Sequence, residues 1–113
     1  MNEYILIFRH EDASKSISQE QMQQWMQQTM DWINDIAAQN KFSDGKGLLF
    51  DEARVVHGGD KRVSEKAFGN LHETIGGYII VRAESIEEAI EFAKGSPVLQ
   101  GQHNSVEVRR IAR

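Results

Sequence analysis

Two short segments of this chain are apolar at consecutive positions rather than at alternate ones. Residues 4–8 read Tyr-Ile-Leu-Ile-Phe, and residues 78–81 read Tyr-Ile-Ile-Val. Short runs of β-branched and aromatic residues with polar ends predict strands, here over residues 3–10 and 75–83. A strand without alternation is usually covered on both faces. The fold of this chain must therefore protect a sheet from both sides.

Two helices are marked by their capping residues. Ser18 and Gln21 have the spacing of a capping box and predict a helix from residue 18 to about residue 40. Ser85 and Glu88 have the same spacing and begin a second, shorter helix, which Gly95 and Pro97 end. The inner face expected for the first helix consists of residues three or four apart, flanked by Trp25 and Trp32: Met22, Met26, Thr29, Ile33 and Ile36.

The remaining segments complete an alternating order of strands and helices. Residues 41–47 are rich in helix and strand breakers and predict a turn, and residues 48–57 suggest one interrupted strand. Residues 58–61, Gly-Gly-Asp-Lys, have the composition of a hairpin loop. Residues 63–74 show no clear period, and residues 105–112 predict a final strand.

The resulting order, β-α-β-β-α-β, is that of a ferredoxin-like α+β fold with an antiparallel sheet. Both helices then lie on one face of the sheet, and the other face is bare in a monomer. Because the two central strands are apolar on both sides, we expect a homodimer that covers this second face.

Length and charge limit what the chain can do. Its 113 residues suggest a single domain over residues 1–113. The net charge of −4 argues against a nucleic-acid partner, which favours a basic surface. The absence of cysteine excludes a disulfide scaffold, a thiolate zinc site and a cysteine nucleophile. The N-terminus lacks the pattern of a signal peptide and the apolar runs are short, so we expect a cytoplasmic protein with no membrane partner.

In a ferredoxin-like sheet the strands lie in the order 4-1-3-2 with antiparallel neighbours, which brings four histidines toward one edge of the sheet. His10 and His57 each end a strand, and His72 and His103 each precede one. Such an edge could be a polar pocket mouth that exchanges protons near neutral pH, or only the solvated ends of strands. Arg9, at the same edge, could hold a carboxylate. No His-x-His or His-Glu-x-x-His spacing occurs, so we expect neither a metal nor a cofactor.

Two further features of this edge have competing interpretations. Gly76 and Gly77 precede a strand rather than a helix, so they do not form a phosphate-binding loop. A bulge or a close approach of backbone is favoured. The Tyr78 hydroxyl could reach a ligand, although packing at the dimer core is the better interpretation.

Several segments together resemble the YCII-related, DGPF-domain family of small bacterial proteins. They are residues 3–9, the glycine pair and strand at 76–81, the helix at 84–97 and the ending at 105–112. The resemblance covers nearly the whole chain and implies a dimeric ferredoxin-like α/β-barrel, in the broad class of small dimeric isomerases.

The chain departs from the family pattern at two motifs. The Asp-Gly-Pro-Phe signature falls on residues 65–68, where only Phe68 is kept. A Lys-Glu pair before the glycines falls on His72 and Glu73, so only the glutamate is kept. Some relatives carry a histidine at the start of the first helix, whereas this chain has none between residues 11 and 56.

Two functions are consistent with these residues. The first is a small-molecule enzyme of isomerase or lyase type, with His10, His72 and Glu73 as the acid–base set. In this hypothesis Glu73 pairs with Arg9 or His10, and a ligand with an acidic group meets Arg9. His57, Phe68 and Tyr78 complete the expected ligand-binding residues. The second function is a non-catalytic dimeric module that binds a ligand or regulates another protein.

Overall fold

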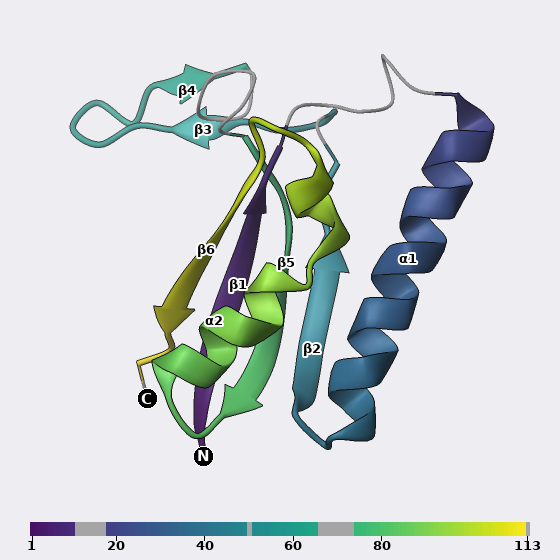
Figure 1. The fold of residues 1–113 in the computed structure, drawn as a ribbon. Helices are drawn as coiled ribbons and strands as arrows, with labels where there is room; N and C mark the ends of the chain where they lie inside the picture. Colours follow the sequence, from purple (N-terminus) through teal and green to yellow (C-terminus); the bar gives the residue numbers. More distant parts are fainter. Residues whose placement is uncertain (11–17, 50, 66–73, 113) are drawn as a thin grey trace.

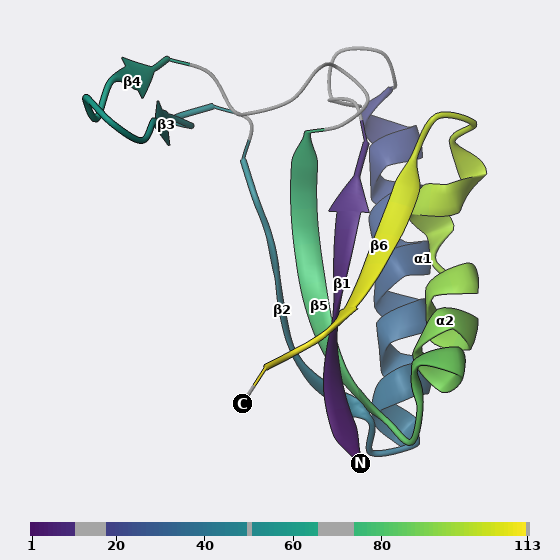
Figure 2. The same cartoon turned by 90° about the vertical axis from the view of Figure 1, so that its left-hand side faces the viewer.

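The computed structural model describes residues 1–10, 18–49, 51–65 and 74–112. Its main sheet has four antiparallel strands in the order β2-β5-β1-β6. These are β1 (Asn2–Arg9), β2 (Phe42–Gly47), β5 (Ile75–Ala83) and β6 (Ser105–Arg110). Helices α1 (Gln19–Ala38) and α2 (Ile86–Lys94) lie on one face of this sheet (Figures 1 and 2). The ferredoxin-like α+β fold is therefore confirmed.

The helix starts agree with the capping residues. The Ser18 side chain accepts a hydrogen bond from the Gln21 backbone N–H, and the Gln21 side chain accepts one from the Ser18 N–H, which is a complete capping box. Ser85 caps α2 by accepting from the Glu88 N–H at 3.2 Å. The Glu88 carboxylate, however, accepts from the backbone of Glu84 rather than from Ser85. Pro97–Gln100 then form a short 3-10 helix.

The core lies between the sheet and the helices. Leu6, Val81 and Ile36 are its largest fully buried side chains, contributed by β1, β5 and α1 in turn. The inner face expected for α1 is wrong at Met26, which is 58% exposed. Trp32, which was expected to flank this face, is turned inward together with Ile36. The Trp32 indole N–H donates to the Phe92 carbonyl of α2 at 3.0 Å. The two helices are thereby joined above the sheet.

The helix-free face of the sheet is apolar at its centre. Val106 and Val108 pack on the core, so Glu107 between them points to the opposite side. By the same alternation, Ile5 and Ile7 of β1 lie on the helix-free face. Tyr78 and Ile80 pair with them across β5. The two-sided apolar pattern of the central strands thus corresponds to one face against the helices and one face turned away from them.

The second strand of the sheet lies where a turn was expected. Residues 42–47 form the edge strand β2, which pairs with β5 from Phe42↔Val81 to Gly47↔Gly77. A Cβ added at Gly45 would lie 2.7 Å from Ile79 Cγ2, and one at Gly77 would lie 2.9 Å from the Lys46 carbonyl oxygen. Glycine is therefore needed here because the two backbones approach closely, not because the chain turns.

Residues 48–57 do not form the expected strand of the main sheet. They contribute only β3 (Val55–Val56), which pairs with β4 (Val63–Ser64) in a separate two-stranded hairpin. The predicted loop at residues 58–61 is correct, with positive φ at Gly59 and Lys61. His57 therefore lies outside the four-stranded sheet, and the expected row of four histidines along its edge does not form at that position.

Candidate functional site

His10 follows the last residue of β1 and is buried on the helix side of the sheet. It is only 8% exposed. Its ring meets the indole of Trp25 from α1 edge to face, with centroids 5.6 Å apart and an interplanar angle of 75°. The His10 backbone N–H donates to the Thr74 carbonyl at 3.2 Å. The imidazole is thus held between the first helix and the start of β5.

Gly76 provides the space for this imidazole. Phe8 pairs with Gly77 and Arg9 pairs with Ile75, so Gly76 is an extra residue on β5, as in a β-bulge. A Cβ added at Gly76 would overlap His10 Nε2 and would lie 2.6 Å from Cε1. The bulge and the close backbone approach predicted for the glycine pair are both present: the Lys46 carbonyl approaches Gly77, and the His10 side chain approaches Gly76. Gly76 therefore positions His10.

Arg9 and Tyr78 lie on the other face of the sheet. The Arg9 guanidinium donates to the Glu107 carboxylate at 3.0 Å, and both side chains are partly exposed. Tyr78 stands between the buried residues Gly77 and Ile79 and is directed to the helix-free side. The sheet thus separates these two predicted ligand-binding residues from the His10 imidazole, so they belong to a second location at the same end of the molecule.

The other predicted site residues are dispersed or lie outside the described residues. His57 is in the β3–β4 hairpin, where its Nε2 is 2.5 Å from Ser64 Oγ. His103 is exposed in the turn before β6, at the same end of the sheet as His10. Phe68, His72 and Glu73 lie outside the described residues, and so does the proposed pairing of Glu73 with Arg9 or His10. The described ranges contain no group of three or more His, Asp or Glu side chains arranged to hold a metal ion.

Trp25 is the residue of this cluster that the sequence did not connect with His10. In the sequence it only flanks the apolar stripe of α1. The structure places its ring against His10, beside Gly76. The helical periodicity indicated which side of α1 Trp25 occupies. What its ring contacts depends on how the helix lies over the end of the sheet.

Among the described helices, none is both long and apolar enough to cross a membrane.

Comparisons with known proteins agree on the fold. No curated protein matches the chain significantly. A solved structure of 5-chloro-2-hydroxyhydroquinone dehydrochlorinase from Burkholderia phenoliruptrix, in complex with 2,5-dihydroxybenzoquinone, is similar with a TM-score of 0.55. The two sequences are 16% identical over an alignment that covers 96% of this chain and 93% of the other. At this identity the similarity concerns the fold.

Comparison with protein-family models gives a more specific result. The model of the YCII-related domain matches residues 2–113, which is nearly the whole chain. The match spans β1, the glycine pair, α2 and β6, the same segments in which the sequence resembles that family. The chain therefore belongs to the YCII-related domain family.

Proposed function

We propose that this protein is a small-molecule enzyme of isomerase or lyase type in which His10 transfers a proton. The supporting observation is the enclosure of the His10 imidazole between the Trp25 ring and the Gly76 backbone. A histidine exchanges protons near neutral pH, and a general acid or base must be held in one orientation relative to its substrate. The bulge at Gly76 supplies that orientation.

His72 and Glu73 are proposed as the other members of the acid–base set. They immediately precede Thr74, whose carbonyl accepts the His10 backbone N–H. The short chain distance supports their acting on the same ligand as His10. Phe68 and His57 are proposed to contribute to ligand binding from the segment between β2 and β5.

The ligand is proposed to be a small molecule with an acidic group. The similar dehydrochlorinase was captured with 2,5-dihydroxybenzoquinone, a planar ring with acidic hydroxyl groups. Trp25 offers an aromatic surface beside His10, which suits a planar ligand. Arg9 is across the sheet from His10 and its guanidinium is paired with the Glu107 carboxylate, so it is not proposed as a contact of this ligand.

The assembly is proposed to be a homodimer formed through the helix-free face. Ile5, Ile7, Tyr78 and Ile80 make the centre of that face apolar, and Arg9 and Glu107 make part of its rim charged. An apolar centre with a polar rim is the usual arrangement of a subunit interface.

The enzyme proposal is tested by replacing His10. We would screen the wild-type protein against hydroxylated quinones and small lactones, following absorbance, and then compare His10→Asn with the exposed control His103→Asn. Loss of an acid–base group should lower kcat by roughly 10²- to 10⁴-fold, whereas His103→Asn should stay within about twofold. If His10→Asn retains full activity, His10 is not the proton-transferring group. Binding without turnover by the wild-type protein would favour the non-catalytic module.

A further inference from the structure

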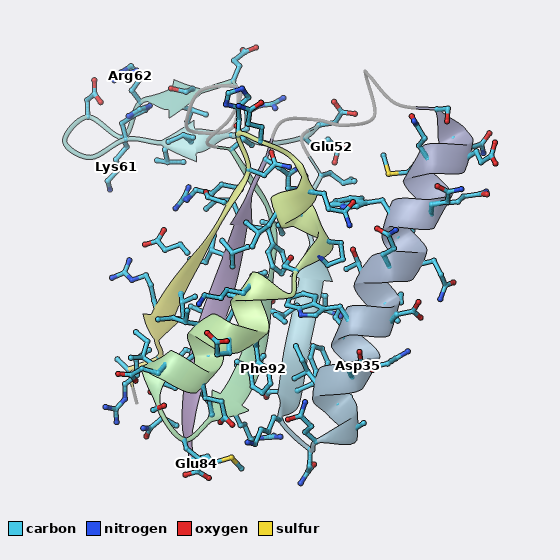
Figure 3. The ribbon with its side chains drawn as sticks, viewed as in Figure 1. Asp35, Glu52, Lys61, Arg62, Glu84 and Phe92 are labelled. Carbon is cyan, nitrogen blue, oxygen red and sulfur yellow. The ribbon has the colours of Figure 1, made fainter. Side chains whose placement is uncertain are left out.

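The β3–β4 hairpin stands away from the rest of the fold. We define the arm as residues 51–65, which contain β3 and β4. Figure 2 shows the arm projecting from one end of the sheet toward the side opposite the helices. Lys61 and Arg62 occupy its outer part (Figure 3). The radius of gyration, 15.2 Å, exceeds the value of about 13 Å expected for a compact domain of this length. The arm therefore extends the molecule on its helix-free side.

One face of the arm is apolar and exposed. Val56 and Val63 are directly opposite each other across the two strands, and they are 66% and 55% exposed. The other face carries Val55, His57 and Ser64, which are half-buried, and the His57–Ser64 contact of 2.5 Å links the two strands there. A two-stranded hairpin is only marginally stable in water unless its apolar face is covered. The Val56–Val63 face requires such a cover.

The described residues that lead from the sheet toward the arm are also apolar and exposed. The segment that leads from β2 to the arm carries two more exposed apolar residues, Leu48 and Leu49. The Leu48 N–H donates to the Gly76 carbonyl at 2.9 Å, so this connection remains attached to the edge of the sheet. The arm leaves the end of the sheet toward the side of the helix-free face, which carries Ile7 and Tyr78 (Figure 2). An object that covers both must present apolar side chains to the sheet face and to the arm.

A second copy of the chain satisfies this requirement. The sheet face alone would offer that copy only a small contact area. Four strands about 4.8 Å apart and about seven residues long present a flat area of roughly 440 Å². A standard interface buries about 800 Å² on each partner. In a two-fold symmetric pair the partner would cover the arm of each protomer, so both arms would add to the area buried in the interface.

We infer that the arm is a dimer clasp: the Val56–Val63 face of each protomer lies on the second copy of the chain, beside the packed helix-free faces. The inference rests on the homodimer proposed above. A dimer could form through the sheet faces alone, whereas the clasp gives the arm a part in holding the two protomers together.

The affinity of the dimer tests this clasp. We would measure the dimer dissociation constant by sedimentation for the wild-type chain, for Val56→Ser/Val63→Ser and for the control Ile86→Ser/Ile90→Ser. The control removes two exposed isoleucines from α2, on the helix side. The arm variant should weaken the dimer by at least about tenfold, because both arms are altered in each dimer, and the control should not. An arm variant with the wild-type dissociation constant would overturn the clasp while leaving the sheet-face dimer intact. A wild-type monomer at all concentrations would overturn the dimer and the clasp together.

A second measurement does not depend on how well the arm variant folds. Because the chain has no cysteine, Val56→Cys can be labelled at a single position with an environment-sensitive fluorophore. Its emission should shift to the red on dilution, in parallel with the loss of the dimer mass. The same label at Ile90→Cys should not respond. Equal behaviour of the two labels would contradict the clasp.

Discussion

At the scale of single residues, the position of the His10 ring depends on Gly76 having no side chain. The imidazole occupies the volume that a Cβ of Gly76 would fill, and the Trp25 ring limits it on another side. Gly76 is therefore selected for the space it leaves, because positive φ does not occur there. The enclosure of the candidate proton-transferring group thus depends on a residue of β5, which lies beside β1 in the sheet but far from it along the chain.

Gly76→Ala should displace His10 and Gly47→Ala should not. A Cβ at Gly76 would overlap the imidazole, whereas one at Gly47 would meet no heavy atom within 4 Å. We expect Gly76→Ala to cost roughly 1–3 kcal/mol of unfolding free energy and to change the Trp25 emission and the NMR chemical shifts of the His10 ring. Gly47→Ala should stay within about 0.5 kcal/mol. Identical His10 spectra in both variants would show that the ring does not depend on Gly76.

At the scale of elements, α2 is attached to the edge strand by one ion pair. The Lys41 ammonium lies 2.6 Å from the Glu88 carboxylate, and both side chains are partly buried. Glu88 also accepts the backbone N–H of Glu84 at 2.9 Å, just before the helix. The Lys41 hydrogen bond and then the Glu84 backbone hydrogen bond lower the pKa of Glu88 below its ordinary value of 4.5. The carboxylate form is therefore the one that the fold stabilises.

This ion pair predicts a specific acid sensitivity. Since the pKa of Glu88 is lower in the folded state, its contribution is present above pH 4.5 and is lost as the pH falls through the folded pKa. Glu88→Gln should lower the stability near neutral pH and should lose less stability on acidification than the wild-type protein. Urea unfolding at about pH 7 and about pH 3 measures the difference.

The neighbouring Glu91 provides a control for this prediction. Its ion pair with Lys94 is exposed and three residues apart on α2. Surface pairs of this kind contribute little to stability, so Glu91→Gln should keep the acid sensitivity of the wild-type protein. An equal response of the two variants would assign the effect to the net charge of the helix.

At the scale of the whole molecule, the two faces of the central strands have different roles. Ile79 is buried against the helices, whereas Ile7 lies on the helix-free face. A charge at position 79 therefore tests folding, and a charge at position 7 tests association.

Ile79→Glu and Ile7→Glu should fail in different ways. Burying a carboxylate at position 79 should cost on the order of 4 kcal/mol and unfold the chain. Ile7→Glu should leave a folded monomer, because its face meets only the partner in the proposed dimer. Circular dichroism reports folding, and light scattering at micromolar concentration reports mass. If the wild-type protein is a monomer, or if Ile7→Glu remains a dimer, the helix-free face is not the interface.

The sequence by itself determined the features that depend on neighbouring residues. The capping box at Ser18, the cap at Ser85 and the apolar runs of β1 and β5 identify their elements from a few residues each, because hydrogen bonds within one turn and side chains within one strand are local. These elements were sufficient to derive the strand order of the sheet, and the glycine pair was correctly interpreted as a bulge.

Only the tertiary structure decided which segment forms the edge strand and on which face of the sheet each side chain lies. Residues 42–47 resemble a turn in isolation and become β2 because their glycines allow close pairing with β5. The same pairing leaves residues 51–65 outside the sheet as the arm, so that His57 is separated from His10. It also brings His10 and Trp25 together on one face while Arg9 lies on the other. The physical reason is that backbone pairing and side-chain burial between segments distant in sequence depend on their approach in space, which local periodicity does not encode.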